Sequence, residues 1–276
     1  ESTAEMKNDA EIKKKILREM EQDRQKLLMR QPFIGMILMH LDFIPVTSGC
    51  KTACTDGSRV FMNCFFYANL DLEERLFVLA HETWHCVLLH FARLQNRDQD
   101  RFNIAADLEI HFILQKEKMK EPFVLPHNPE WDGLSAEEIY EKLVPKKDRR
   151  GQPKKFKSPG CCSKGFANNS KSFDKHIYNG GADGREDKKI SSKSASRNPE
   201  YDAESGPDPD FAPKVNAQSV EKIRQIVIQT ACSIERRQGS LPGNLQSIVD
   251  RLRKPELNWK ELLKQYITSC FGGERN

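Results

Sequence analysis

The segment 81–85 places two histidines four positions apart inside a long apolar stretch, and this pattern constrains the chain more than any other feature. Asp71 and Glu74 form a capping-box pattern, which predicts a helix from residue 72 to about residue 93. On such a helix His81 and His85 project from one face, so both imidazoles can reach one tetrahedral zinc ion. Burying them in apolar surroundings without a metal would be costly. The sequence therefore predicts a zinc site on this helix.

Glu82 is the expected catalytic residue. It directly follows His81 and completes an HExxH pattern, in which the glutamate holds and deprotonates a zinc-bound water. The pattern predicts a zinc-dependent metallopeptidase: the water attacks a carbonyl polarised by Zn²⁺, and Glu82 then passes the proton to the leaving amine. The alternative is a metal-bearing adaptor or scaffold with little or no turnover, in which zinc serves the fold or a partner interface.

A zinc hydrolase needs a third protein ligand, which leaves the fourth position for water. The extended HExxHxxGxxH motif is absent, because positions 88 and 91 hold Leu and Phe. The ligand is expected on a following helix near residues 98–114, where Asn103, Asp107 and His111 share one face and Glu109 lies about 200° from Asp107. Asp107 is preferred, because its carboxylate is a good ligand and its small neighbours allow close helix approach. His111, Asn103 and Glu109 remain alternatives.

Two further residues have expected supporting roles. With Asp107 on the metal, Asn103 lies one turn earlier and is well placed to hydrogen-bond to it. His90 comes nine residues after His81, so a continuous helix would put it on the opposite side. We expect a structural or supporting role for His90 rather than ligation.

The remaining pattern predicts a helix-dominated α+β fold with a small β-sheet or hairpin. The Asp-Gly turn signal at residues 56–57 lies between short apolar runs, which predicts a hairpin or a strand edge within 52–66. Val60–Asn63 is a candidate edge strand that aligns extended substrate by strand addition. Helical periodicity is predicted at 5–31, 33–41, 135–143, 220–231, 245–252 and 259–266.

The charge is distributed unevenly. Residues 146–197 hold 15 Lys and Arg against 5 Asp and Glu and few large apolar residues, whereas the whole chain has a net charge of only +4. This composition predicts a disordered basic insertion at 146–212, between a metal-binding core at 1–145 and C-terminal helices at 213–276 that pack back on the core. Nucleic-acid binding through the insertion is a further hypothesis, but a solvated tether is favoured. The rest of the chain is acidic.

The sequence also allows a prediction of the cellular location of the protein. The longest apolar stretch, near residues 33–45, is interrupted by His40 and Asp42 and falls short of the roughly 20 residues that a bilayer span requires. The eight cysteines form no CxxC pair, which is typical of reduced thiols. With no secretory signal at the start, we expect a cytoplasmic location and no membrane partner.

Several of these residues together resemble a known family. The resemblance covers about 33–143 and, weakly, 258–263, and it is carried by the segments Thr52–Gly57, Leu79–His85, Asn103–Asp107 and Gly133–Tyr140. It is to the bacterial and phage putative metallopeptidases whose C-terminal half is a von Willebrand A-like domain.

The resemblance implies a zincin-like core with His81, His85 and Asp107 at the ligand positions and Glu82 at the catalytic one. It further implies a polypeptide substrate and partnership with a MoxR-type AAA+ ATPase. The basic insertion departs from the family pattern, and residue 276 falls where the A-like domain would begin. The chain is therefore expected to be the catalytic half of such a protein or a shortened relative.

Overall fold

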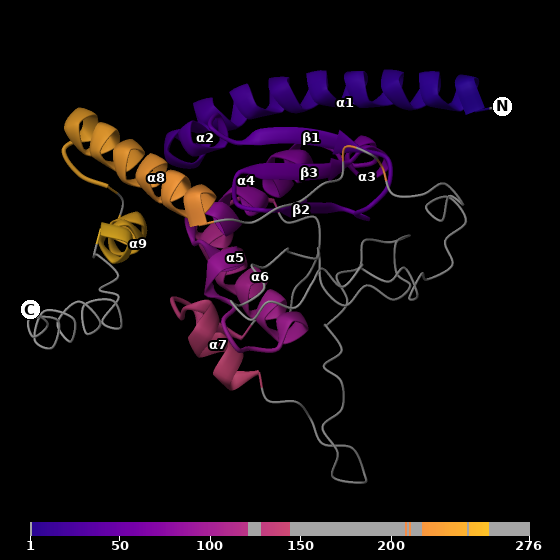
Figure 1. The fold of residues 1–276 in the computed structure, drawn as a ribbon. Coiled ribbons are helices and arrows are strands. Elements are labelled where there is room, and N and C mark those ends of the chain that lie inside the picture. Colours follow the sequence, from indigo (N-terminus) through magenta and orange to yellow (C-terminus); the bar gives the residue numbers. More distant parts are fainter. Residues whose placement is uncertain are drawn as a thin grey trace, which may run out of the picture. The chain divides into compact units, whose positions relative to one another are not determined.

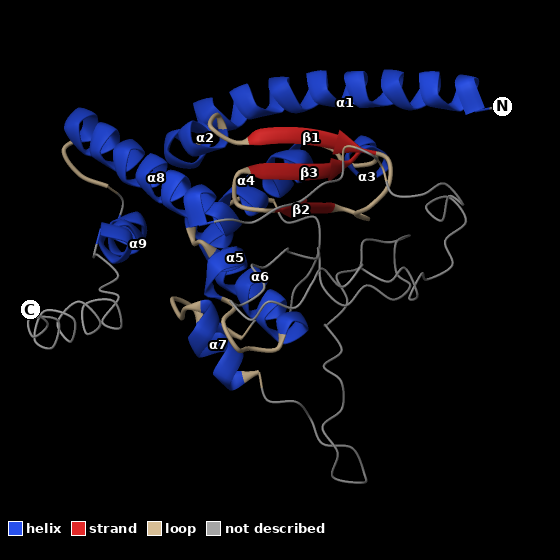
Figure 2. Ribbon diagram, viewed as in Figure 1, coloured by secondary structure: helices blue, strands red, loops and turns tan. Residues whose placement is uncertain are grey.

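The structure is a computed structural model that describes residues 2–120, 128–143, 208, 210, 217–241 and 243–253. The chain divides into two compact units, residues 1–230 and 231–276, and the boundary lies inside helix α8 (Ala217–Gln238). Helices dominate the described residues, and one small sheet accompanies them, as Figure 2 shows. The predicted helix-dominated α+β class is confirmed. The helix predicted at 259–266 and nearly all of the insertion lie outside the described residues, and the three-part domain division stays a prediction.

Helix α1 (Ser2–Arg30) is the amphipathic opening helix that the sequence predicts. Ile16, Met20 and Leu27 are buried along one side, at the spacing expected for one helical face. Pro32 begins α2 (Pro32–Leu38), where its missing N–H costs no helical hydrogen bond. α1 packs against α2, β1 and α4, and Figure 1 shows it running alongside the sheet.

The sheet contains β1 (Asp42–Val46), β2 (Ala53–Thr55) and β3 (Arg59–Asn63) in the order β1-β3-β2. β2 and β3 form the predicted hairpin, with Cys54 opposite Phe61. β1 pairs in parallel with β3, with Ile44 opposite Phe61. The predicted edge role of Val60–Asn63 is therefore wrong, because both sides of β3 are already paired and no extended substrate can add there.

Two elements in this region differ from the prediction, each for a physical reason. β1 is not evident from the sequence, because its partner in the parallel pair lies beyond the next strand and Pro45 weakens its strand pattern. The run after Asn63 is the short helix α3 (Cys64–Ala68) rather than a strand. The Asn63 side chain accepts a hydrogen bond from the Phe66 N–H and so begins the helix.

Helix α4 (Leu72–Val87) begins with the predicted capping box of Asp71 and Glu74. Every residue from 76 to 88 is buried, as expected of a helix that is apolar around its circumference. The helix ends at Val87, whereas a single helix to about residue 93 was predicted. Leu89 adopts the left-handed conformation, with φ 54°, and α5 (His90–Arg93) starts in a new direction.

A buried carboxylate fixes α4 to its neighbours. Asp23 of α1 is 1% exposed and accepts hydrogen bonds from the Tyr67 hydroxyl (3.0 Å) and the Arg75 Nε (2.7 Å). Burial, together with the adjacent Asp23 charge, raises the pKa of Tyr67 above its usual range, so the phenol stays a hydrogen-bond donor. The contact joins α1, α3 and the first turn of α4, and thereby positions the helix that carries the two histidines.

Helix α6 (Gln99–Lys116), predicted near residues 98–114, is capped by the Asp98 side chain and packs against α4 and α7 (Ala136–Lys142). The short helix η1 (Pro129–Trp131) precedes α7. A capping box of Ser135 and Glu138 begins α7, within the stretch 135–143 that is predicted to be helical. In the C-terminal unit, α9 (Gly243–Arg253) is joined to the end of α8 by Arg253, which donates to Glu235. None of the described helices combines the length and apolar character needed to cross a bilayer. The cytoplasmic location stays a prediction.

The turn between β2 and β3 depends on a glycine. Gly57 has φ 93°, and a Cβ added there would lie 2.4 Å from the Phe91 ring of α5. Gly133 also has positive φ, but no atom lies within 4 Å of its added Cβ. We expect Gly57→Ala to lower the free energy of unfolding by about 1–3 kcal/mol more than Gly133→Ala, because only the former forces a packed ring to move. Urea unfolding followed by circular dichroism measures both, and equal losses would show that the Phe91 contact is unimportant.

Candidate metal centre

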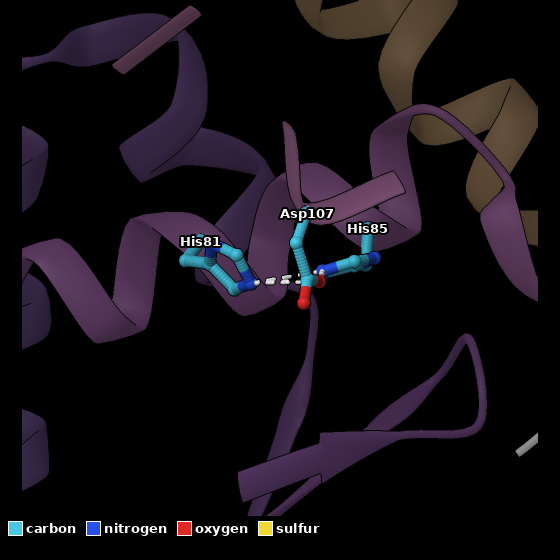
Figure 3. A group of neighbouring side chains, drawn as sticks. All are labelled: His81, His85 and Asp107. Atoms are coloured by element: carbon cyan, nitrogen blue, oxygen red, sulfur yellow. Dashed lines mark hydrogen bonds and ion pairs between the residues drawn. The ribbon is translucent and has the colours of Figure 1, made fainter. Parts of the chain in front are cut away.

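The three predicted ligands lie together where α4 contacts α6. His81 and His85 lie one turn apart on α4, with their Nε2 atoms 2.9 Å from each other. Asp107 of α6 places its Oδ1 3.6 Å from the His81 Nε2 and 3.3 Å from the His85 Nε2. Figure 3 shows the Asp107 carboxylate between the two imidazole rings. Within the described part of the chain, these side chains form a group whose ligand atoms all lie within 4.8 Å of one another.

These separations fit a single metal ion. With metal–ligand bonds of about 2.0–2.1 Å in a tetrahedron, neighbouring ligand atoms lie about 3.3 Å apart. The observed separations of 2.9, 3.3 and 3.6 Å bracket that value. Two imidazoles and one carboxylate also form a donor set that zinc accepts while keeping its fourth position for another ligand. The residues present therefore fit a zinc-type ion.

The side chains of the centre are buried. His81, His85 and Asp107 are each at most 2% exposed, and Glu82 is fully buried. The Phe77 ring stacks against the His81 ring, with centroids 6.1 Å apart. Such an environment strengthens charge interactions and makes uncompensated polar groups costly.

A buried cysteine beside the centre is no competitor for the metal. The Cys86 sulfur lies 3.2 Å from the Thr55 hydroxyl, on the side of α4 that contacts β2. Burial raises the pKa of the Cys86 thiol to about 12, although the hydrogen bond to Thr55 opposes the shift. Its sulfur contacts Thr55 of β2, and Cys86 does not belong to the group of three side chains whose ligand atoms lie together.

The other candidate ligands on α6 have different positions. Glu109 faces away from the three-residue group, and its Oε2 lies 3.0 Å from the Nε2 of His90. His111 is buried on α6 but does not belong to the group. Asn103 is buried one turn before Asp107, and its predicted hydrogen bond to Asp107 stays a prediction.

His90 is placed differently from the sequence expectation. On a continuous helix it would lie opposite His81, but the turn at Leu89 brings its Nδ1 to 3.0 Å from the Nδ1 of His85. Sequence reasoning gave His90 a supporting role without finding its contact. The signal for a break was weak, because neither Gly nor Pro interrupts the apolar run.

Comparison with known families places the chain in one of them. A family model described as a putative metallopeptidase domain matches residues 15–274. The chain belongs to this metallopeptidase family. The match confirms the resemblance to putative metallopeptidases and extends well beyond the stretch 33–143 that carried it, whereas the von Willebrand A-like domain stays a prediction. Searches of curated proteins and of solved structures found no match.

Metal binding by this family member should depend on three side chains. We expect one zinc ion per chain, and we expect His85→Ala and Asp107→Ala to weaken binding by more than the roughly 10–100-fold typical of losing an outer hydrogen-bond partner. Asn103→Ala should weaken it less, and His40→Ala, which changes an exposed histidine, should not weaken it. Zinc affinity measured by chelator competition tests this. Equal affinities for the Asp107→Ala variant and the original protein would exclude Asp107 as a ligand.

Proposed function

We propose that this protein is a zinc-dependent peptidase in which Glu82 acts as the general base. The observation that carries the proposal is the convergence of the His81 Nε2, the His85 Nε2 and the Asp107 Oδ1 at single-ion distances. Glu82 follows the first of these ligands on the same helix and is fully buried. The family assignment supports peptide hydrolysis as the reaction class.

The roles of the protein's own groups follow from their chemistry. His81, His85 and Asp107 would hold the ion, which when bound polarises a carbonyl and lowers the pKa of water in the site. Glu82 accepts the proton of the attacking water as the new C–O bond forms. It then donates that proton to the amine nitrogen as the C–N bond breaks, so the carboxylate is regenerated.

Zinc is favoured over iron by the residue that accompanies the ligands. Two histidines and one carboxylate also form the facial donor set of non-haem Fe(II) oxygenases. A glutamate directly after the first histidine, with the second histidine four positions from the first, instead suits hydrolysis, because a carboxylate base is then adjacent to the ion. Metal analysis of the purified protein distinguishes the two ions.

The burial of the centre favours a second candidate function. All four key side chains are at most 2% exposed, and a polypeptide substrate needs access to the ion and to Glu82. A metal-bearing scaffold with little turnover needs no such access. Under the peptidase proposal, the described conformation is a closed form that must open before substrate binds. Partnership with a MoxR-type AAA+ ATPase stays a prediction, and an ATPase would be a suitable source of energy for such opening.

The decisive test of the peptidase proposal is Glu82→Gln. The amide has the same shape but cannot accept the water's proton, so cleavage of an unfolded, fluorescently labelled protein should fall by about 10²–10⁴-fold. Zinc content and the circular dichroism spectrum should be unchanged. Hydrolysis at the original rate by the Glu82→Gln variant would reject the mechanism. Zinc-loaded original protein that cleaves none of a wide panel of unfolded proteins and peptides would favour the scaffold.

A further inference from the structure

A chain of buried polar side chains extends from the candidate metal centre. The Nδ1 of His85 lies 3.0 Å from the Nδ1 of His90, and the Nε2 of His90 lies 3.0 Å from the Oε2 of Glu109. His90 is fully buried, and Glu109 is 6% exposed. The chain joins α4, α5 and α6, and it leaves the centre from the ring nitrogen of His85 that does not face Asp107.

The far end of this series of polar side chains is the Glu109 carboxylate, which is surrounded by hydrogen-bond donors. The Oε2 of Glu109 accepts a hydrogen bond from the Ala136 N–H (2.8 Å), and the Arg93 Nη2 lies 3.5 Å away. Both neighbours carry only N–H donors toward this oxygen, so the Oε2 of Glu109 is placed to accept hydrogen bonds. Arg93 stays charged: its burial would lower the pKa, but the hydrogen bond to Glu137 and the nearby carboxylates outweigh burial and raise it.

The position of each proton follows from that acceptor. With the Glu109 oxygen as acceptor, the Nε2 of His90 carries a hydrogen, and the Nδ1 of a neutral His90 is then a hydrogen-bond acceptor. That nitrogen accepts from the Nδ1–H of His85. Neutral His85 then has its lone pair on Nε2, the nitrogen that lies 3.3 Å from the Asp107 Oδ1. A metal ligand requires this tautomer.

We propose that His90 and Glu109 are positioning residues that fix the metal-binding tautomer and the ring orientation of His85. The proposal rests on the proposed metal centre, but it concerns how the site is held and not whether it hydrolyses peptides. It also assigns a function to the docking of α7, because the Ala136 N–H at the start of that helix orients Glu109. Arg93 reinforces the contact by pairing with Glu137 of the same helix.

The test uses the whole polypeptide and zinc, without any substrate. We expect His90→Phe, which keeps a ring but removes both nitrogens, to lower zinc affinity by roughly 10–100-fold. Glu109→Gln should lower it less, because the amide oxygen can still accept from His90. In zinc-free protein, nitrogen-15 NMR of the histidine rings should show His85 protonated at Nδ1, and this single tautomer should become a mixture in His90→Phe. A role in packing alone would not change the tautomer.

Thr83→Val is the matched control. Thr83 is fully buried between the two histidines on α4, and its hydroxyl donates to the Leu79 carbonyl within the same helix. Its zinc affinity and its His85 tautomer should match those of the original protein. If His90→Phe does not fold, Glu109→Leu, which removes the acceptor of His90 but keeps a side chain of similar length, gives the same two measurements.

The outcomes separate this proposal from the peptidase proposal. Variants at 90 and 109 with the original zinc affinity would overturn the positioning role, as would a His85 protonated at Nε2 in zinc-free protein or a protein that binds no zinc. Zinc-loaded protein without hydrolytic activity would overturn the peptidase proposal alone, because affinity and tautomer are measured without substrate.

Discussion

The burial of charged and polar groups where α4 contacts α6 is the constraint on which the rest of the structure depends. α4 is covered on all sides, so His81, Glu82 and His85 lie in the interior together with Asp107 of α6. Polar groups in such surroundings need hydrogen-bond partners or a metal, because desolvation is otherwise uncompensated. The convergence of three ligand atoms at single-ion distances is one way to meet that need. The capping box and the Asp23 contacts at the start of α4 hold the helix in the required place.

The change of direction at Leu89 gives the centre its outer support. A left-handed residue other than glycine costs free energy, and here it accompanies a specific arrangement of polar side chains. After the turn, His90 faces back toward His85, and the Arg93 side chain donates to the Leu88 carbonyl and to Glu137. Helix α5 thus provides a hydrogen bond to the carbonyl that follows the end of α4, and it connects His85 to α7. A continuous helix to residue 93 would direct His90 away from His85.

The burial of the centre restricts how a substrate could reach it. The sheet gives substrate no free edge at β3, because that strand is paired on both sides, so strand addition at Val60–Asn63 is not the route of substrate binding. Because Glu82 is fully buried, the peptidase proposal requires the elements around α4 and α6 to move before a substrate can reach it. Hydrogen bonds connect the Ala136 N–H in the first turn of α7 to Glu109, and Glu109 to His90, which contacts His85. Displacement of α7 would therefore disturb the contacts of His85.

The sequence alone determined the features that depend on local chemistry. Capping residues fixed where α4, α6 and α7 begin, apolar periodicity gave α1, and the HExxH spacing together with the helical phase of Asp107 identified the group that the structure brings together. Tertiary structure decided what depends on contacts between distant segments: the parallel pairing of β1 with β3, the end of α4 at Val87, and the contacts of His90 with His85 and Glu109. Residue types and spacing specify the conformation of one turn or one helix. A buried hydrogen-bond chain, in contrast, exists only when several elements have packed, because its free energy comes from partners that lie far apart in the sequence.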